Sequence, residues 1–448
     1  MLLLILSSLA GACVRTDRGL GDLTVASNGT VAAYWYDSVS AFGSVHTKEF
    51  ACSAYVRWID LDHPIFVRSK LIYAKRESFC SLTSFVDRAL AFSPDSKYIG
   101  VRIGGELHCV DPQSSKTWQL SLPEEYVSSF CWVGNDEIAY ARVGPDGGVF
   151  KRRVQEPSPN RVPVLQGSLP PLTLLPKQLN RPWEELIRRT PHEWWAPNGR
   201  FVIVAWGDQS IHLFDTESGI VRSYERPFPS VAVGWKPDSS MCLVALGDTD
   251  FKPGKMFLLS PIDGSIRDLT DPFVETFKSP ERKEVRRSSW AIDVQALGES
   301  IPRAVSLDHG DNLDWTADGK FVIISSPMHG ACLVRPDPWE VVELGSGFAT
   351  AMRDTEAYRQ AVRLHKKETL FSLSVLPVAG WVKAWMGGHE YAVNYERNEA
   401  VELAAYIISA ASPAVVTNDG HRVVTLDILG NLKVSPLDLS KAPVVAKW

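Results

Sequence analysis

The densest cluster of polar side chains in the sequence lies at residues 307–312, which read Leu-Asp-His-Gly-Asp-Asn. A histidine between two aspartates can hold a metal ion or transfer a proton near neutral pH. Asp and Asn also form turns at the entrance to a strand, because their side chains bond to their own backbone. We therefore name Asp308, His309 and Asp311 as candidate binding residues, and we regard the turn as the more common explanation of this pattern.

No other pattern in the sequence predicts chemistry. Gly247-Asp248-Thr249-Asp250 resembles the start of a calcium loop, but Lys252 and Pro253 follow it, so a hairpin is favoured. No serine lies in a Gly-x-Ser-x-Gly elbow, and no glycine-rich phosphate loop joins a strand to a helix. No Cys-x-x-Cys pair or Cys/His cluster has zinc spacing. We expect no catalytic residue, no cofactor and no metal site.

The composition favours a large packed core. Of the 448 residues, 45% are apolar, and 15 are tryptophans, whose rings usually anchor the packing of sheets. The formal net charge is −5, whereas a protein that binds nucleic acid usually presents a basic face. We therefore expect no nucleic-acid partner.

The first 13 residues form a separate segment. A short apolar run, Leu2 to Leu6, is followed by small residues and Cys13, which is typical of a secretory signal and far too short to span a bilayer. The segment resembles the lipobox of bacterial lipoproteins, and this resemblance implies that Cys13 is acylated and becomes the mature N-terminus. It departs from that family in having no Lys or Arg before the apolar run, and Ala10 where Leu is preferred. The expected organisation is a signal at 1–13, a short tether at 14–22 and one domain at 23–448.

The six other cysteines leave their pairing open. Cys52 with Cys80 and Cys109 with Cys131 are the neighbouring candidates for disulfides in an exported protein. Several of these cysteines lie inside apolar strand patterns, where a buried free thiol is the simpler interpretation.

From about residue 23 one unit repeats along the chain. Each copy has an apolar strand, a turn of Asn, Asp or Gly, and a second apolar strand, followed by further strands. Eight copies centre on residues 27–35, 93–101, 134–141, 197–205, 237–246, 317–325, 378–385 and 418–426. Turn centres at 95 and 135, 198 and 238, and 379 and 419 are each 40 residues apart, which is the length of a four-stranded propeller blade.

A second regularity supports the repeat. Three residues before each turn centre stands a bulky apolar residue, which predicts a packing position between neighbouring sheets. These residues are Val25, Phe92, Trp132, Trp195, Trp235, Trp315, Leu376 and Val416. The tryptophans outside this position are candidates for binding anchors on a surface.

The segments SPDSKYIGV, APNGRFVIV, KPDSS and TADGKFVII resemble the repeats of TolB-like and WD40-like β-propellers. The resemblance covers nearly the whole chain after the signal, although the regular Gly-His and Trp-Asp pairs of true WD40 repeats are absent. It implies an all-β fold with a single β-propeller, with eight blades favoured and seven possible. We also predict short helical insertions at 182–189 and 351–366, and closure of the ring by strands from both chain ends.

The favoured function is a non-enzymatic interaction platform for a protein partner. The protein would be exported and held on the periplasmic or cell-surface side of a membrane by its lipid anchor alone. The alternative is a propeller enzyme, such as a hydrolase, lyase or oxidoreductase, with its active site at the mouth of the channel. Ionisable residues converging from equivalent turns would indicate the enzyme, but those turns hold ordinary Asn, Asp and Gly. A further alternative is a cytoplasmic scaffold with a misassigned start.

Overall fold

A computed structural model describes the greater part of the chain. The described residues are 14–28, 30–41, 49–62, 68–77, 90–103, 105–122, 125–143, 148–156, 192–205, 210–225, 230–247, 253–272, 312–326, 330–342, 372–386, 389–405, 415–426, 432–441 and 444–447. The chain divides into two compact units, which we describe separately. Unit 1 comprises residues 1–173 and 425–434, and unit 2 comprises residues 174–424 and 435–448.

Three sheets of consecutive antiparallel strands lie in unit 1. The first contains β1 (Val14–Val25), β2 (Thr30–Ala41), β3 (Glu49–Asp60) and β4 (Arg68–Glu77). The second contains β5 (Leu90–Phe92), β6 (Ile99–Ile103), β7 (Glu106–Val110) and β8 (Thr117–Gln119). The third contains β9 (Tyr126–Trp132), β10 (Glu137–Val143) and β11 (Gly148–Arg153).

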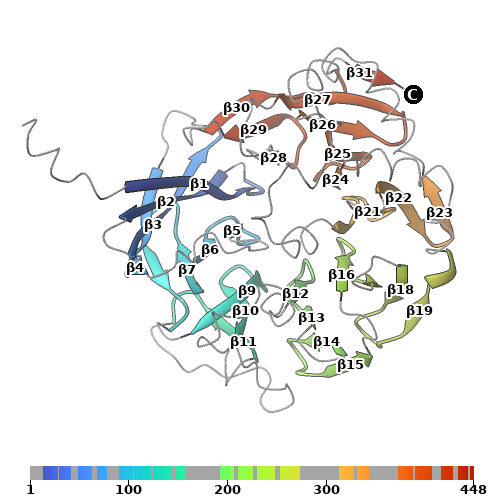
Figure 1. Ribbon diagram of the computed structural model, residues 1–448, viewed down its shortest axis with the longest axis horizontal. Helices are drawn as coiled ribbons and strands as arrows, with labels where there is room; N and C mark the ends of the chain where they lie inside the picture. Colours follow the sequence, from blue (N-terminus) through green and yellow to red (C-terminus); the bar gives the residue numbers. More distant parts are fainter. Residues whose placement is uncertain are drawn as a thin grey trace, which may run out of the picture. The chain divides into compact units, whose positions relative to one another are not determined.

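Four further sheets lie in unit 2, and successive sheets contact one another in chain order (Figure 1). They begin with β12 (His192–Trp195), β13 (Phe201–Ala205), β14 (Ser210–Asp215) and β15 (Val221–Glu225). Next come β16 (Ser230–Trp235), β17 (Cys242–Gly247), β18 (Pro253–Leu259) and β19 (Ile266–Asp268). The third sheet contains β20 (Asn312–Trp315), β21 (Val322–Ser326), β22 (Gly330–Pro336) and β23 (Trp339–Val342). The fourth contains β24 (Ser372–Val375), β25 (Trp381–Met386), β26 (His389–Asn394), β27 (Glu399–Ala405) and the C-terminal β31 (Val444–Lys447).

An eighth sheet has the order β28 (Val415–Val416), β29 (Arg422–Leu426) and β30 (Leu432–Pro436). Each of the eight predicted sequence units therefore forms a sheet of its own. The prediction of an all-β β-propeller is confirmed. The predicted helical insertions, 182–189 and 351–366, lie outside the described residues.

The first hairpin of each sheet explains the repeated turn residues. In five hairpins a residue with positive φ donates its backbone N–H, over 2.8 Å, to the carbonyl three residues earlier. These five residues are Ser96, Gly199, Ser239, Gly319 and Gly420. The Asp or Asn just before each accepts an N–H bond from the residue two positions onward in the chain, as Asn198 does from Arg200 at 3.0 Å. The turn chemistry in the sequence thus fixes the hairpin geometry.

Two of these turns hold a serine where glycine would be less strained. Ser96 and Ser239 have φ values of 62° and 60°. Their hydroxyls compensate, because each bonds to the turn of the preceding sheet. The Ser239 hydroxyl accepts the backbone N–H of Asn198 at 3.1 Å, and the hydroxyls of Ser96 and Ser27 lie 2.9 Å apart.

The predicted packing position is confirmed at three tryptophans. Each donates its indole N–H to a backbone carbonyl in the first strand of the preceding sheet, one residue before the equivalent position. The bonds join Trp132 to Ala91 in unit 1, and Trp235 to Trp194 and Trp315 to Gly234 in unit 2, at 2.9–3.0 Å. A buried donor must find an acceptor, so this bond fixes how one sheet lies on the next.

Gly234 shows how closely two sheets approach in unit 2. A Cβ atom at this position would lie 2.3 Å from the carbonyl oxygen of Leu313, in the backbone of β20. In unit 1, Gly100 of β6 faces a side chain of the next sheet and not its backbone. A Cβ at Gly100 would lie 2.7 Å from Cε2 of Phe130, which belongs to a side chain and can move.

The chain ends differ from two expectations. The prediction that strands from both ends share one sheet is wrong for the described residues, because β1 pairs within the first sheet and β31 pairs with β27. Residues 14–22, expected as a tether, lie within β1.

Three cysteines are free thiols, Cys109, Cys131 and Cys242. Cys109 and Cys131 are both reduced, so their candidate disulfide is not formed, and Cys242 is free as well. Cys109 and Cys242 lie in apolar cores, where burial raises the pKa of their thiols. The buried free thiol is therefore the correct interpretation of these positions.

Candidate functional site

A group of buried and half-buried ionisable side chains lies between the β5–β8 and β9–β11 sheets of unit 1. The register pairs Tyr140 of β10 with Phe150 of β11, and Arg142 with Gly148. Side chains of residues two apart on a strand share a face, so Tyr140 and Arg142 lie on the same face as Phe150 and Arg152. That face also carries Phe130 and Trp132 and packs on the β5–β8 sheet.

We call the polar part of this layer the arginine end, defined by Arg102, Glu125, Tyr140, Arg142 and Arg152. Arg142 pairs with Glu125 at 2.9 Å between Nη1 and Oε1. The second carboxylate oxygen of Glu125 accepts the backbone N–H of Leu122 at 2.9 Å. Arg102 is buried and donates to the carbonyls of Val127 and Ser128. These contacts fix the connection between β8 and β9.

Arg152 and Tyr140 have fewer partners. Arg152 donates to the backbone carbonyls of Leu120 and Glu156, and among the described residues no carboxylate pairs with it. The Tyr140 side chain is fully buried, and its hydroxyl has no hydrogen-bond partner. Burial raises the pKa of Tyr140, and the positive charges of Arg152 and Arg142 act in the opposite direction.

A second buried pair lies in β7, on the face of the β5–β8 sheet opposite to the one that carries Leu107 and Cys109. Nε2 of His108 is 3.1 Å from Oε2 of Glu106, and both side chains are buried. A metal site would need a third ligand. The described residues contain no group of three or more His, Cys, Asp or Glu side chains that could hold a metal ion.

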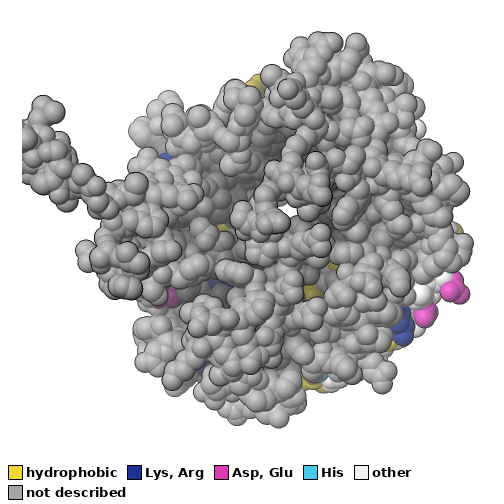
Figure 2. Space-filling view, in the orientation of Figure 1, with side chains coloured by type: hydrophobic (Ala, Val, Ile, Leu, Met, Phe, Trp, Pro, Cys, Tyr) yellow, Lys and Arg dark blue, Asp and Glu magenta, His cyan; other side chains and the backbone are white. Residues whose placement is uncertain are grey.

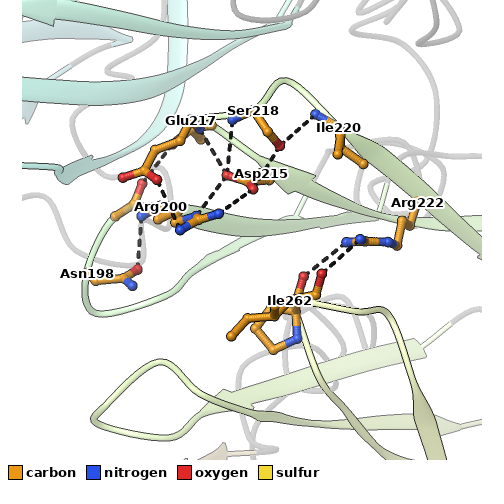
Figure 3. A network of polar contacts seen from close by, with 11 residues as sticks. Asn198, Arg200, Asp215, Glu217, Ser218, Ile220, Arg222 and Ile262 are labelled. Atoms are coloured by element: carbon orange, nitrogen blue, oxygen red, sulfur yellow. Dashed lines mark hydrogen bonds and ion pairs between the residues drawn. The ribbon is translucent and has the colours of Figure 1, made fainter.

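The main polar network of unit 2 is structural (Figure 3). Arg200 donates two hydrogen bonds, of 3.0 and 2.9 Å, to the carboxylate of Asp215 and pairs with Glu217 at 3.0 Å. Asp215 also accepts the backbone N–H groups of Glu217 and Ser218 and the Ser218 hydroxyl. Burial would raise the pKa of the Asp215 carboxyl, but the bonds from Arg200 and Ser218 hold it well below its usual range. This carboxylate joins two turns of one sheet.

Three exposed isoleucines, Ile220 and Ile262 in turns and Ile266 at the start of β19, are together called the isoleucine edge. The exposed fractions are 49% for Ile220, 70% for Ile262 and 47% for Ile266. Arg222 donates to the carbonyls of Pro261 and Ile262 at 3.0 and 2.9 Å, which holds the turn before β19 against β15 (Figure 3). The edge therefore belongs to two neighbouring sheets held in a fixed relation.

The surface near β19 also carries charge. Figure 2 shows acidic and basic side chains side by side at the edge where Figure 1 places β19. Arg267 of β19 pairs with Asp337 in the turn that follows β22. Outer strands are thus linked to the next sheet by arginines, both here and at Arg222.

The residues singled out from the sequence as candidate sites are not among those described. Asp308, His309 and Asp311, the candidate binding residues, and Cys13, the candidate lipidation site, all lie outside the described residues. The described residues contain no helix long and apolar enough to cross a membrane.

The off-repeat tryptophans are packing residues where they are described. Trp381 is buried, and Trp118, Trp194 and Trp339 pack against apolar cores. The arginine end and the isoleucine edge were not identified from the sequence. The available signal for the first was an arginine inside an apolar strand, as in Ile-Ala-Tyr-Ala-Arg-Val at 138–143. The isoleucines carry no such signal, because single apolar residues are common in turns.

No protein-family model and no curated protein matches the sequence. Among solved structures, a chain of the mitotic checkpoint complex is similar at a TM-score of 0.40 and 11% identity, covering 95% of this chain and 91% of that chain. The β-propeller domain of Cps50 (Swd1) from Myceliophteria thermophila has a TM-score of 0.41 and 12% identity, over 87% and 94% of the two chains. The dihydro-heme d1 dehydrogenase NirN has a TM-score of 0.43 and 11% identity, over 94% and 67%.

Proposed function

We propose that this chain is a non-enzymatic β-propeller that binds a protein partner, and that a lipid on Cys13 holds it at a membrane after export. The isoleucine edge carries the first part of this proposal. Exposed apolar residues that gather at one place on a surface mark sites of protein association, whereas single ones need no explanation. Ile220 and Ile262 are exposed in turns of two neighbouring sheets that Arg222 joins, and the exposed Ile266 begins the strand that follows.

The polar side chains at the repeated turns support a structural role for those turns. Asp215 binds Arg200 and the backbone of its own turn, and Asp111 binds the backbone N–H groups of Gln113 and Ser114 in the same way. A carboxylate whose oxygens accept these bonds stabilises its own turn. The proposal therefore places recognition on the isoleucine edge, and Asp308, His309 and Asp311 stay candidate binding residues.

Site-specific photo-crosslinking in cells tests the protein partner. A benzophenone amino acid at position 262 should give one discrete adduct, because a partner that covers the edge lies within reach of the probe. Adding purified unlabelled chain to the lysed cells before illumination should compete the adduct away. An unlabelled chain carrying Ile220→Asp and Ile266→Asp should compete much less, since burying a charge against an apolar partner is costly.

The matched control places the same probe at Lys441, whose side chain is 83% exposed in a turn of the same unit. It should give no competed adduct. Equal adducts at positions 262 and 441, or equal competition by the wild-type and doubly substituted chains, would contradict a binding role for the edge.

The lipid anchor needs a separate experiment. Cells are labelled with a radioactive fatty acid, and the wild-type chain is compared with Cys13→Ala. Only the wild type should carry label and sediment with membranes. Absence of label from both chains would refute acylation and leave the proposed protein binding unaffected.

A further inference from the structure

We propose that unit 1 binds a small oxyanion at the arginine end, between the β5–β8 and β9–β11 sheets, through the Tyr140 hydroxyl and the guanidinium group of Arg152. This site is separate from the isoleucine edge and does not depend on it. The ligand would be a carboxylate or a phosphate group, which share the acceptor oxygens that these donors require.

The first observation is the Tyr140 hydroxyl. Buried hydroxyls in folded proteins almost always have a hydrogen-bond partner, because an unpaired one loses its bonds to water without replacement. Tyr140 is fully buried and stacks on Phe150 with ring centroids 5.7 Å apart, yet its hydroxyl has none. A donor in this situation indicates an acceptor that comes from outside the chain.

The second observation is the charge of Arg152. Its side chain is half-buried, and its two described bonds go to neutral backbone carbonyls, those of Leu120 and Glu156. Arg142, by contrast, is paired with Glu125. Buried charges are normally paired, so the positive charge of Arg152 favours an anion beside it.

The third observation is the arrangement of these groups on one face. Tyr140 and Arg152 lie on adjacent strands, two residue pairs apart in the register, with Arg142 on the far side of Tyr140. Gly148 stands opposite Arg142 and leaves that position without a side chain. Phe150, Leu120 and Val127 belong to the same buried apolar cluster as Tyr140. Apolar surroundings strengthen the bonds between an anion and its donors.

Thermal unfolding of the full chain tests the site with two probes, inorganic phosphate and acetate, at constant ionic strength in sodium chloride. At least one probe should raise the unfolding midpoint of the wild type and saturate, since a ligand that binds the folded state stabilises it. Tyr140→Phe keeps the ring and removes the donor, so it should weaken the apparent affinity about tenfold or more. A response to phosphate alone or to acetate alone would identify which class is bound.

Tyr224→Phe is the matched control, because it removes a tyrosine hydroxyl that bonds to the Gly264 carbonyl at 3.4 Å in unit 2. Its response to the anion should equal that of the wild type. Isothermal titration calorimetry with the same probe should give the same order of affinities. The proposal is overturned if neither anion shifts the wild-type midpoint, which would assign the Tyr140 hydroxyl to a buried water, or if Tyr140→Phe binds as tightly as the wild type.

Discussion

Two sheet-to-sheet layers can be compared directly, that between β5–β8 and β9–β11 in unit 1 and that between β16–β19 and β20–β23 in unit 2. Each is held by a tryptophan N–H, from Trp132 in the first and Trp315 in the second, bonded at 3.0 Å to a carbonyl of the preceding sheet. The unit 2 layer has an apolar core, brings two backbones together at Gly234, and has its Arg267–Asp337 ion pair at an exposed position. The unit 1 layer instead ends in charged side chains. The repeated tryptophan bond therefore fixes how neighbouring sheets pack, whereas the other side chains of a layer can differ from one pair of sheets to the next.

The largest loss of stability is expected where a methyl group is added between two closely packed backbones. Gly234→Ala places a methyl group against the Leu313 carbonyl and forces the sheets apart, which should reduce the free energy of unfolding by about 3 kcal/mol. Gly100→Ala in the unit 1 layer meets only the side chains of Phe130 and Ile138 and should cost about 1 kcal/mol. Denaturant titrations of both variants measure the two costs.

Gly134→Ala is the control for this pair, because nothing lies within 4 Å of the Cβ it would add. Its unfolding midpoint should equal that of the wild type. If Gly234→Ala were no more destabilising than Gly100→Ala, the contrast between a backbone contact and a side-chain contact would be wrong.

The second largest loss of stability is expected at Asp215 of unit 2, which can be compared with Asp111 in the equivalent turn of unit 1. Asp215 binds Arg200, so Asp215→Asn should lower the free energy of unfolding at neutral pH by about 2 kcal/mol. For Asp111, burial would raise the carboxyl pKa, but Ser114 and backbone N–H groups lower it. No arginine bond to Asp111 is found among the described residues, so Asp111→Asn should cost less than Asp215→Asn.

The Asp215 carboxylate makes the stability of the folded chain fall with decreasing pH. The pKa of Asp215 is lower in the folded chain than in the unfolded chain, where it is about 3.9. Its contribution is therefore fully present above that unfolded value and is lost as the pH falls below it, because the folded carboxylate must then be protonated. Between about pH 5 and pH 2 the wild type should lose more stability than Asp215→Asn. Parallel acid profiles for the two proteins would show that Asp215 contributes nothing through its charge.

The smallest effect is expected at the strained serines. Ser239→Ala removes the hydroxyl bonded to Asn198 and keeps the positive φ, so it should cost about 1 kcal/mol. Ser239→Gly removes the same bond but relieves the backbone, so its cost should be smaller. Ser96 in unit 1 should follow the same order. A Ser239→Gly variant less stable than Ser239→Ala would contradict strain at this turn.

The sequence predicted the scaffold because the scaffold repeats. Asn198 and Gly199 had the turn chemistry that the hairpins use, and Trp132, Trp235 and Trp315 stood at a fixed offset that proved to be a sheet-to-sheet bond. A repeated sequence pattern indicates a repeated structure, and eight copies are enough to recognise the repeat. Closure by both chain ends was wrong because the pairing of β31 with β27 follows no periodic signal.

The candidate sites could not be predicted in the same way, because each occurs once. Tyr140 and Arg152 come together through the register of β10 and β11, which the sequence does not state. Ile262 is unusual only because Arg222, from the neighbouring sheet, holds its turn in place. The off-repeat tryptophans drew attention as surface anchors, yet Trp381 is buried, since the repeat has more than one aromatic packing position.

The most direct test of the scaffold is hydrogen–deuterium exchange of the indole N–H groups, followed by NMR of the full chain. The N–H groups of Trp132, Trp235 and Trp315 should exchange slowly and at similar rates, because the same buried bond holds each of them. Trp118, whose described contact is an edge-on ring contact with Tyr98, should exchange fast. Exchange of the three as fast as that of Trp118 would show that no common bond joins the sheets.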